Sequence, residues 1–153
     1  MIDVKNGNVF PMDSSECLYP RMPLSDFQRS RLFATSRKNQ TYNNRVNAQY
    51  VLGPLQFIGE NVLFVLDFTH EALIGIMLFL SPHQFERGWF QEICHFFEST
   101  NELSAEETKE FCDRWLQQAI GQSCSEVTYP PWGEIRSVHD ELRDGAWIEI
   151  EYW

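Results

Sequence analysis

Histidine and cysteine are the side chains that most often hold metal ions or act as nucleophiles and bases, and this 153-residue chain has four of each. His139, Asp140 and Glu141 are consecutive at the end of an expected strand. Neighbouring side chains on a strand point to opposite faces, so this run does not form one metal site. Cys94 and His95 are adjacent on an expected helix and diverge by about 100°. The sequence therefore predicts neither a metal site nor a nucleophile–base pair.

Motifs of known catalytic sites do not occur in the chain either. It contains no G-x-S-x-G nucleophile elbow, no Walker loop and no G-x-G-x-x-G turn. The paired acids Glu106 and Glu107 follow a helix cap, where the positive end of the helix dipole favours carboxylates. We therefore predict a protein without catalytic residues and without a cofactor. A small-ligand-binding protein or an enzyme remains the least favoured of three interpretations, after two kinds of protein-binding domain.

Asp67 is a carboxylate that the pattern places inside a buried strand, between Leu66 and Phe68. One interpretation is a functional acid whose pKa is raised by burial. The other is a capping role, in which Asp67 accepts hydrogen bonds from the amides of Thr69 or His70 in the next turn. We favour the capping role.

The C-terminal segment "WGEIRSVHDELRDGAWIEIEYW" alternates apolar and polar residues with period two, which is typical of strands with one buried face. We expect Ala146, Ile148, Ile150 and Tyr152 to face the core. The opposite face combines tryptophan contact area with negative charge, which suits a basic protein partner. The alternative is that a helix packs over it. The candidate partner-binding residues are Trp147, Glu149, Glu151, Trp153, Glu134, Asp140 and Glu141.

The elements that position this face follow from caps and periodicity. Residues 49–80 read as a meander of three strands, and residues 133–153 as a hairpin in the same sheet. Helices near 82–98 and 104–120 begin with capping boxes, Ser81 with Gln84 and Ser104 with Glu107. We also expect a small hairpin at Asn6-Gly7 and a short helix from the cap Ser25 to about Leu32. This order predicts a single α+β domain over residues 1–153, with a mostly antiparallel central sheet and two main helices packed on it.

The charge of the chain is −10, and it is unevenly distributed. Residues 1–80 hold seven acids and seven bases, whereas residues 81–153 hold fifteen acids and five bases. Such a surface repels nucleic acid and anionic membranes and attracts basic partners, so we predict no nucleic-acid or membrane partner. The segment Arg21 to Arg45 is locally basic, and either binds an anion or lies against the acidic half. We favour the second role.

The expected compartment is the cytoplasm. The first residues, "MIDVKNGNVFPMDSSE", have no basic start followed by an apolar core, which a signal peptide or an anchor would need. The apolar stretch of residues 62–80 is interrupted by charged residues and reads as two strands. The four cysteines, Cys17, Cys94, Cys112 and Cys124, form no C-x-x-C pair, and we expect free thiols.

Three stretches, "YPRMPLSDFQRSRLF", "FVLDFTHEALIGIMLFL" and the closing "WGEIRSVHDELRDGAWIEIEYW", give the chain a layout that resembles small bacterial immunity proteins. These are cytosolic antidotes encoded beside the polymorphic toxins of contact-dependent and type VI systems. The resemblance implies an acidic α+β domain that occludes the active site of one cognate basic toxin domain, for example a nuclease. It carries over no binding residue by position and does not define the oligomeric state. The alternative is another protein-interaction or adaptor domain.

Overall fold

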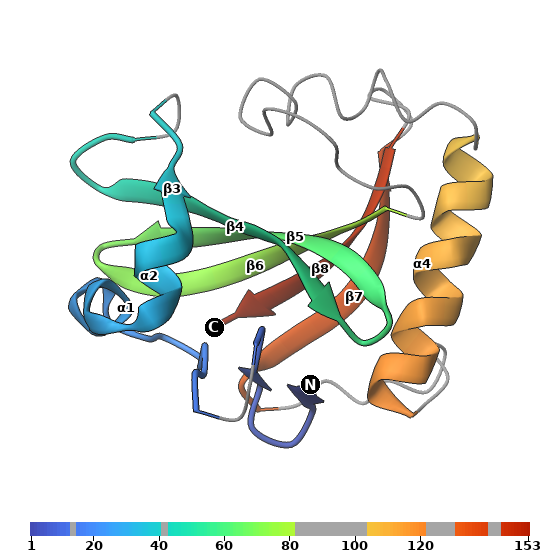
Figure 1. Cartoon of the computed structure of the whole chain (residues 1–153), viewed down its shortest axis with the longest axis horizontal. Coiled ribbons are helices and arrows are strands. Elements are labelled where there is room, and N and C mark those ends of the chain that lie inside the picture. Colours follow the sequence, from blue (N-terminus) through green and yellow to red (C-terminus); the bar gives the residue numbers. More distant parts are fainter. Residues whose placement is uncertain (13–14, 41–42, 82–103, 122–130, 141–144) are drawn as a thin grey trace.

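The structure is a computed structural model that describes residues 1–12, 15–40, 43–81, 104–121, 131–140 and 145–153. It is an α+β fold around a six-stranded antiparallel sheet with the strand order β3-β4-β5-β6-β8-β7 (Figure 1). The sheet strands are β3 Ser36–Lys38, β4 Asn47–Phe57, β5 Glu60–Thr69, β6 Ala72–Ser81, β7 Gly133–Asp140 and β8 Gly145–Tyr152. The other described elements are β1 Ile2–Asp3, β2 Asn8–Val9, α1 Leu24–Arg29, α2 Arg31–Thr35 and α4 Ala105–Ile120. The predicted fold class and the mostly antiparallel sheet are confirmed.

The predicted meander is formed by β4, β5 and β6, which pair in chain order. Its two turns, at Ile58-Gly59 and at His70-Glu71, consist of residues with positive φ, as two-residue hairpin turns require. The C-terminal hairpin joins this meander because β8 pairs with β6, and β7 then forms the edge of the sheet. The prediction that residues 49–80 and 133–153 share one sheet is therefore correct.

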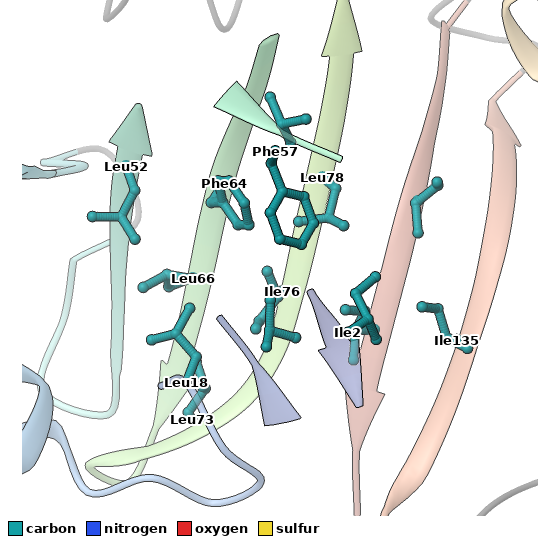
Figure 2. Packing of buried hydrophobic residues seen from close by; sticks show 14 of the residues in the cluster. Ile2, Leu18, Leu52, Phe57, Phe64, Leu66, Leu73, Ile76, Leu78 and Ile135 are labelled. Carbon is teal, nitrogen blue, oxygen red and sulfur yellow. The ribbon is translucent and has the colours of Figure 1, made fainter. Parts of the chain in front are cut away.

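One face of the sheet carries the main hydrophobic core. Figure 2 shows side chains of β4, β5, β6 and β7 gathering there with Ile2 and Leu18 from the N-terminal segment. As predicted, the core face of β8 consists of Ala146, Ile148, Ile150 and Tyr152, all buried. Figure 1 shows α1 and α2 at one end of the sheet and α4 beside β7 and β8 at the other.

The opposite face of the sheet has a smaller apolar cluster. Its buried members come from β4, β5 and β6, and two partly buried residues pack against them. The cluster consists of Val51, Leu63, Val65 and Phe79, with Met77 and Trp147 against it. Strand β5 is buried on both faces, in agreement with the run of apolar residues in its sequence, which is typical of a central strand.

Helix α4 confirms the second predicted helix. Ser104 Oγ accepts a hydrogen bond from the Glu107 amide at 3.2 Å, and the Glu107 carboxylate accepts one from the Ser104 amide at 2.7 Å. The helix ends at Gly121, whose φ of 67° places it in the left-handed region that terminates many helices. Trp115 anchors it to the sheet by donating to the Ile58 carbonyl at 3.2 Å. The first predicted helix, near 82–98, and its cap partner Gln84 lie outside the described residues.

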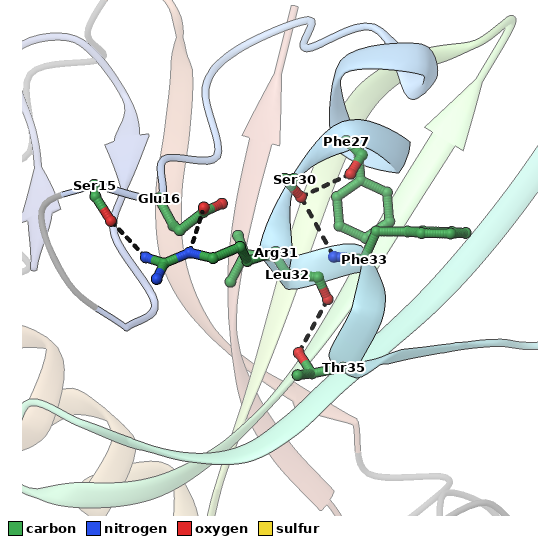
Figure 3. A network of polar contacts seen from close by, with 8 residues as sticks. All are labelled: Ser15, Glu16, Phe27, Ser30, Arg31, Leu32, Phe33 and Thr35. Carbon is green, nitrogen blue, oxygen red and sulfur yellow. Dashed lines mark hydrogen bonds and ion pairs between the residues drawn. The ribbon is translucent and has the colours of Figure 1, made fainter.

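The single helix predicted from Ser25 to Leu32 is wrong. The structure has two short helices, α1 and α2, separated by Ser30 in an extended conformation, and Ser25 caps neither. Ser30 Oγ instead accepts from the Phe33 amide at 3.3 Å and donates to the Phe27 carbonyl at 2.7 Å (Figure 3). Positions five apart on one helix diverge by about 140°. The break at Ser30 therefore allows both Phe27 and Leu32 to be fully buried.

The N-terminal hairpin of β1 and β2 is also as predicted, with Ile2 opposite Val9. Two aromatic residues of the C-terminal region hold it against the core. Trp132 Nε1 donates to the Val4 carbonyl at 2.7 Å, and the Tyr152 hydroxyl donates to the Gly7 carbonyl at 2.8 Å.

The thiols of Cys17 and Cys112 are free, as expected, whereas Cys94 and Cys124 lie outside the described residues. Among the described helices, none combines the length and the apolar character that a membrane span requires.

Candidate partner-binding face

The register of the sheet aligns the predicted acidic residues in rows on the face opposite the main core. One row runs across five strands, and we call it the polar row. It consists of Gln49, Asp67, Gly75, Glu151 and Glu134 on β4, β5, β6, β8 and β7. In the next row, Glu149 of β8 lies opposite Arg136 of β7. Because alternate residues of a strand share a face, both rows lie on one side of the sheet.

Three carboxylates surround the guanidinium of Arg136. Arg136 Nη1 lies 2.6 Å from Glu134 Oε1, and Nη2 lies 2.8 Å from Glu149 Oε2 and 3.8 Å from Glu151 Oε2. The side chain of Glu134 is only 13% exposed, that of Glu149 29%, and those of Glu151 and Arg136 about half. The hydrogen bond to Glu149 raises the pKa of Arg136 above its ordinary value. We call Arg136 with these three glutamates the carboxylate cluster; it has a net charge of −2.

Trp147 of β8 and Trp153, which directly follows β8, have different environments. Trp147 is partly buried and packs against Phe79, with the ring centroids 6.0 Å apart, so it belongs to the smaller apolar cluster. Trp153 is 58% exposed, and its amide contacts the Trp132 carbonyl at 3.4 Å. Of the two tryptophans predicted to contact a partner, Trp153 is therefore the one that is exposed to solvent.

One further predicted residue, Asp140, lies at the turn end of the C-terminal hairpin. Asp140 ends β7 and pairs in register with Gly145 of β8. Glu141 lies outside the described residues. The structure thus brings Glu134, Glu149 and Glu151 together, with Trp153 two residues beyond Glu151, just after the end of β8.

Asp67 does not cap the turn after β5, contrary to the role we favoured. Its Oδ1 accepts a hydrogen bond from Gln49 Nε2 at 2.7 Å, and Gln49 Oε1 accepts one from Asn39 Nδ2 at 2.6 Å. Gln49 and Asn39 are the two buried polar residues of the described chain, 7% and 8% exposed. Burial of the carboxylate raises the pKa of Asp67, the bond from Gln49 opposes this rise, and the charge of Glu149 adds to it.

Sequence reasoning missed Arg136, Gln49 and Asn39. A signal for Arg136 exists, because it is two residues after Glu134 on a period-two strand and so shares its face. Gln49 and Asn39 gave no such signal, since their partner Asp67 comes from a different part of the chain.

The basic segment Arg21 to Arg45 forms ion pairs within its own half of the chain. Arg31 Nε lies 3.0 Å from Glu16 Oε1, and Arg31 Nη2 donates to Ser15 Oγ at 2.6 Å (Figure 3). Arg29 pairs with Asp26 on α1. These pairs do not support our expectation that the segment lies against the acidic half.

Within the parts of the chain that the structure describes, no group of three or more His, Cys, Asp or Glu side chains is placed to hold a metal ion. On the core face of β7, His139 Nε2 and Ser137 Oγ are buried without a hydrogen-bond partner among the described residues. They lie opposite Ala146 and Ile148, on the other side of the sheet from the carboxylate cluster.

Neither a protein-family model nor a curated protein nor a solved structure matches the chain.

Proposed function

We propose that this chain is a binding protein that neutralises a basic toxin domain by covering its active site, as an immunity protein does. A nuclease is the kind of toxin that fits best, because an enzyme that attracts a polyanion needs a basic cleft, and an acidic inhibitor uses the same field. The observation that carries the proposal is the carboxylate cluster, where three glutamates of one hairpin already bind a guanidinium beside an exposed tryptophan.

Within the cluster, Glu151 is the carboxylate best placed to meet a partner. Its side chain is 52% exposed, and it lies 3.8 Å from Arg136, farther than the other two glutamates. A carboxylate offers about four acceptor positions, so a lysine or arginine of the partner can bind Glu151 without displacing Arg136.

Arg136 also holds the side chains of Glu134 and Glu149 in place through its ion pairs. These two glutamates therefore lose less conformational entropy when a partner binds. Trp153, which directly follows β8 and is 58% exposed, supplies an aromatic contact two residues from Glu151.

The experiment that tests this function is co-purification with the protein encoded next to this chain, followed by affinity measurements at several salt concentrations. Glu149→Lys with Glu151→Lys should weaken binding and remove most of its salt dependence, because two attractive charges become repulsive. Partly desolvated charge pairs of this kind contribute on the order of a few kcal/mol together. Glu151→Lys alone should show the same trend with less disturbance of Arg136.

A matched control reverses two exposed carboxylates elsewhere. Glu106→Lys with Glu110→Lys makes the same charge change on α4, which packs on the opposite side of the sheet from the cluster. It should reduce long-range attraction slightly and leave the affinity at high salt unchanged. If the double variant on β8 folds normally and binds with the affinity and salt slope of the original chain, this face is not the interface.

An adaptor domain with a different basic partner would use the same carboxylate cluster. The toxin proposal requires in addition that the neighbouring gene product be harmful to cells on its own and harmless when both proteins are expressed together. A neighbouring protein that binds the chain but has no toxicity would favour the adaptor.

A further inference from the structure

Asp67 is a carboxylate in the interior of the sheet. Its strand β5 has β4 on one side and β6 on the other, and Leu63 and Val65 on the same face of β5 are almost fully buried. A carboxylate in such a place is costly when ionised, because the loss of hydration is offset only by the groups that bond to it. The one hydrogen bond that the structure gives Asp67 comes from Gln49, a neutral donor.

The ionised form of Asp67 sets the direction of the whole hydrogen-bond chain. An ionised carboxylate only accepts, so Gln49 must turn its Nε2 towards Asp67 and its Oε1 towards Asn39. Asn39 Nδ2 then donates to that oxygen at 2.6 Å, as found. A protonated Asp67 keeps an oxygen that can accept from Gln49, so the chain tolerates both charge states.

The charges that face Asp67 are mostly negative. On β6, the register partner of Asp67 is Gly75, so no side chain lies between Asp67 and Glu151 in the polar row. The positive charge of Arg136 is paired with the three glutamates of the carboxylate cluster. The charged side chains that the described strands place nearest to Asp67 on this face include Glu149 and Glu151 of β8, Glu134 and Arg136 of β7, and Arg37 of β3, whose register partner Val51 is in the neighbouring row.

We propose that Asp67, bonded to Gln49 and lying across Gly75 from Glu151, is a proton-binding site that couples the charge of the polar row to the stability of the fold. Uptake of one proton removes a negative charge from the row. It therefore removes the free-energy cost of burying the ionised carboxylate and its repulsion with Glu149. This property does not depend on the identity of the partner.

The sign follows from linkage. Burial and Glu149 raise the pKa of Asp67 in the folded protein, so the folded state binds this proton more tightly than the unfolded state does. The contribution of Asp67 to the free energy of unfolding is therefore largest at pH values below the ordinary aspartate pKa of about 3.9. It decreases as the pH rises through the higher folded-state pKa. Above that pKa, ionised Asp67 makes the fold less stable than a neutral side chain of the same shape would.

The test combines a titration with unfolding measurements. NMR of the side-chain carboxyl carbons of the full chain, assigned through bonds, gives the pH at which Asp67 titrates, without any variant. We expect this pH to be above the ordinary aspartate value. Glu149→Gln should shift it downwards, because a negative neighbour is removed. Glu60→Gln, at the other end of β5, should leave it unchanged.

The linked stability is measured by urea unfolding across the same pH range. Asp67→Asn keeps an acceptor for Gln49, and should be more stable than the original chain at neutral pH and equal to it at low pH. Titration of Asp67 at or below the ordinary value would overturn the proposal. So would a stability difference that does not vary with pH, or an Asp67 titration that Glu149→Gln leaves in place.

Discussion

Arg136 holds together the three glutamates on the acidic face of the sheet. Without it, Glu134, Glu149 and Glu151 would repel one another at close range. With it, the three carboxylates are held in one place and their net charge is reduced. The outward face of β8 thus carries a group of charges organised around Arg136 of β7, in which Glu151 and Arg136 are each about half exposed.

Gly133 is the residue that lets β7 approach β8 beside this cluster. Its φ is 153°, and a Cβ atom there would lie 1.8 Å from the Glu151 carbonyl oxygen. Gly133→Ala should therefore force the two strands apart and destabilise the fold by about 2 kcal/mol, measured by urea unfolding. Gly59→Ala is the control: its site has positive φ but no atom within 4 Å of the added Cβ. It should cost only the backbone strain of about 1 kcal/mol, and an equal loss in both variants would contradict the argument.

The sequence predicted the helices and strands correctly where residues within the element itself determine its structure. Helix α4 has its capping box and its glycine end within the segment itself, so pattern and structure agree at Ser104, Glu107 and Gly121. The strands of the meander and of the last hairpin were found from period two and apolar runs. Caps and periodicity use neighbours in the chain, and these were sufficient here.

The failures at this scale come from interactions between distant segments. Ser25 and Ser30 both resemble helix caps, and the choice between them depends on burying Phe27 and Leu32 against the sheet. Asp67 was assigned to its own turn, whereas its partner Gln49 lies on β4. For the candidate site, the pattern gave the face of β8 but not the strand register, which is what places Arg136 opposite Glu149.

The two serines provide a direct test of the capping assignment. Ser30→Ala removes the cap of α2 and should lower the free energy of unfolding by about 1 kcal/mol. Ser25→Ala is the matched control, because Ser25 is exposed within α1 and caps no helix. It should be neutral or slightly stabilising, since alanine is the better helix former. Urea unfolding of both variants measures this, and an equal cost for the two would mean that Ser25 has a structural role after all.

At the scale of the whole molecule, a chain of charge −10 carries part of its excess on one side of the sheet. Self-repulsion of this kind destabilises the compact state and at the same time attracts basic partners. The polar row and the carboxylate cluster share that field, because the charge of Glu149 acts on both Arg136 and Asp67. The proposed proton binding and the proposed partner-binding face therefore involve the same few side chains.

Arg136→Gln tests this link. Its removal leaves three glutamates without their cation, so the variant should be less stable at low ionic strength by about 1 kcal/mol, on the scale of partly exposed ion pairs. Much of the loss should disappear near 1 M salt, where the Debye length is about 3 Å and the remaining repulsion is screened. Arg114→Gln, an exposed site on α4, makes the same charge change as a control and should have little effect at either salt concentration. Thermal unfolding at the two salt concentrations measures both variants. A loss for Arg136→Gln that is equal at low and high salt would show that Arg136 stabilises the sheet by packing its aliphatic stem rather than by its charge.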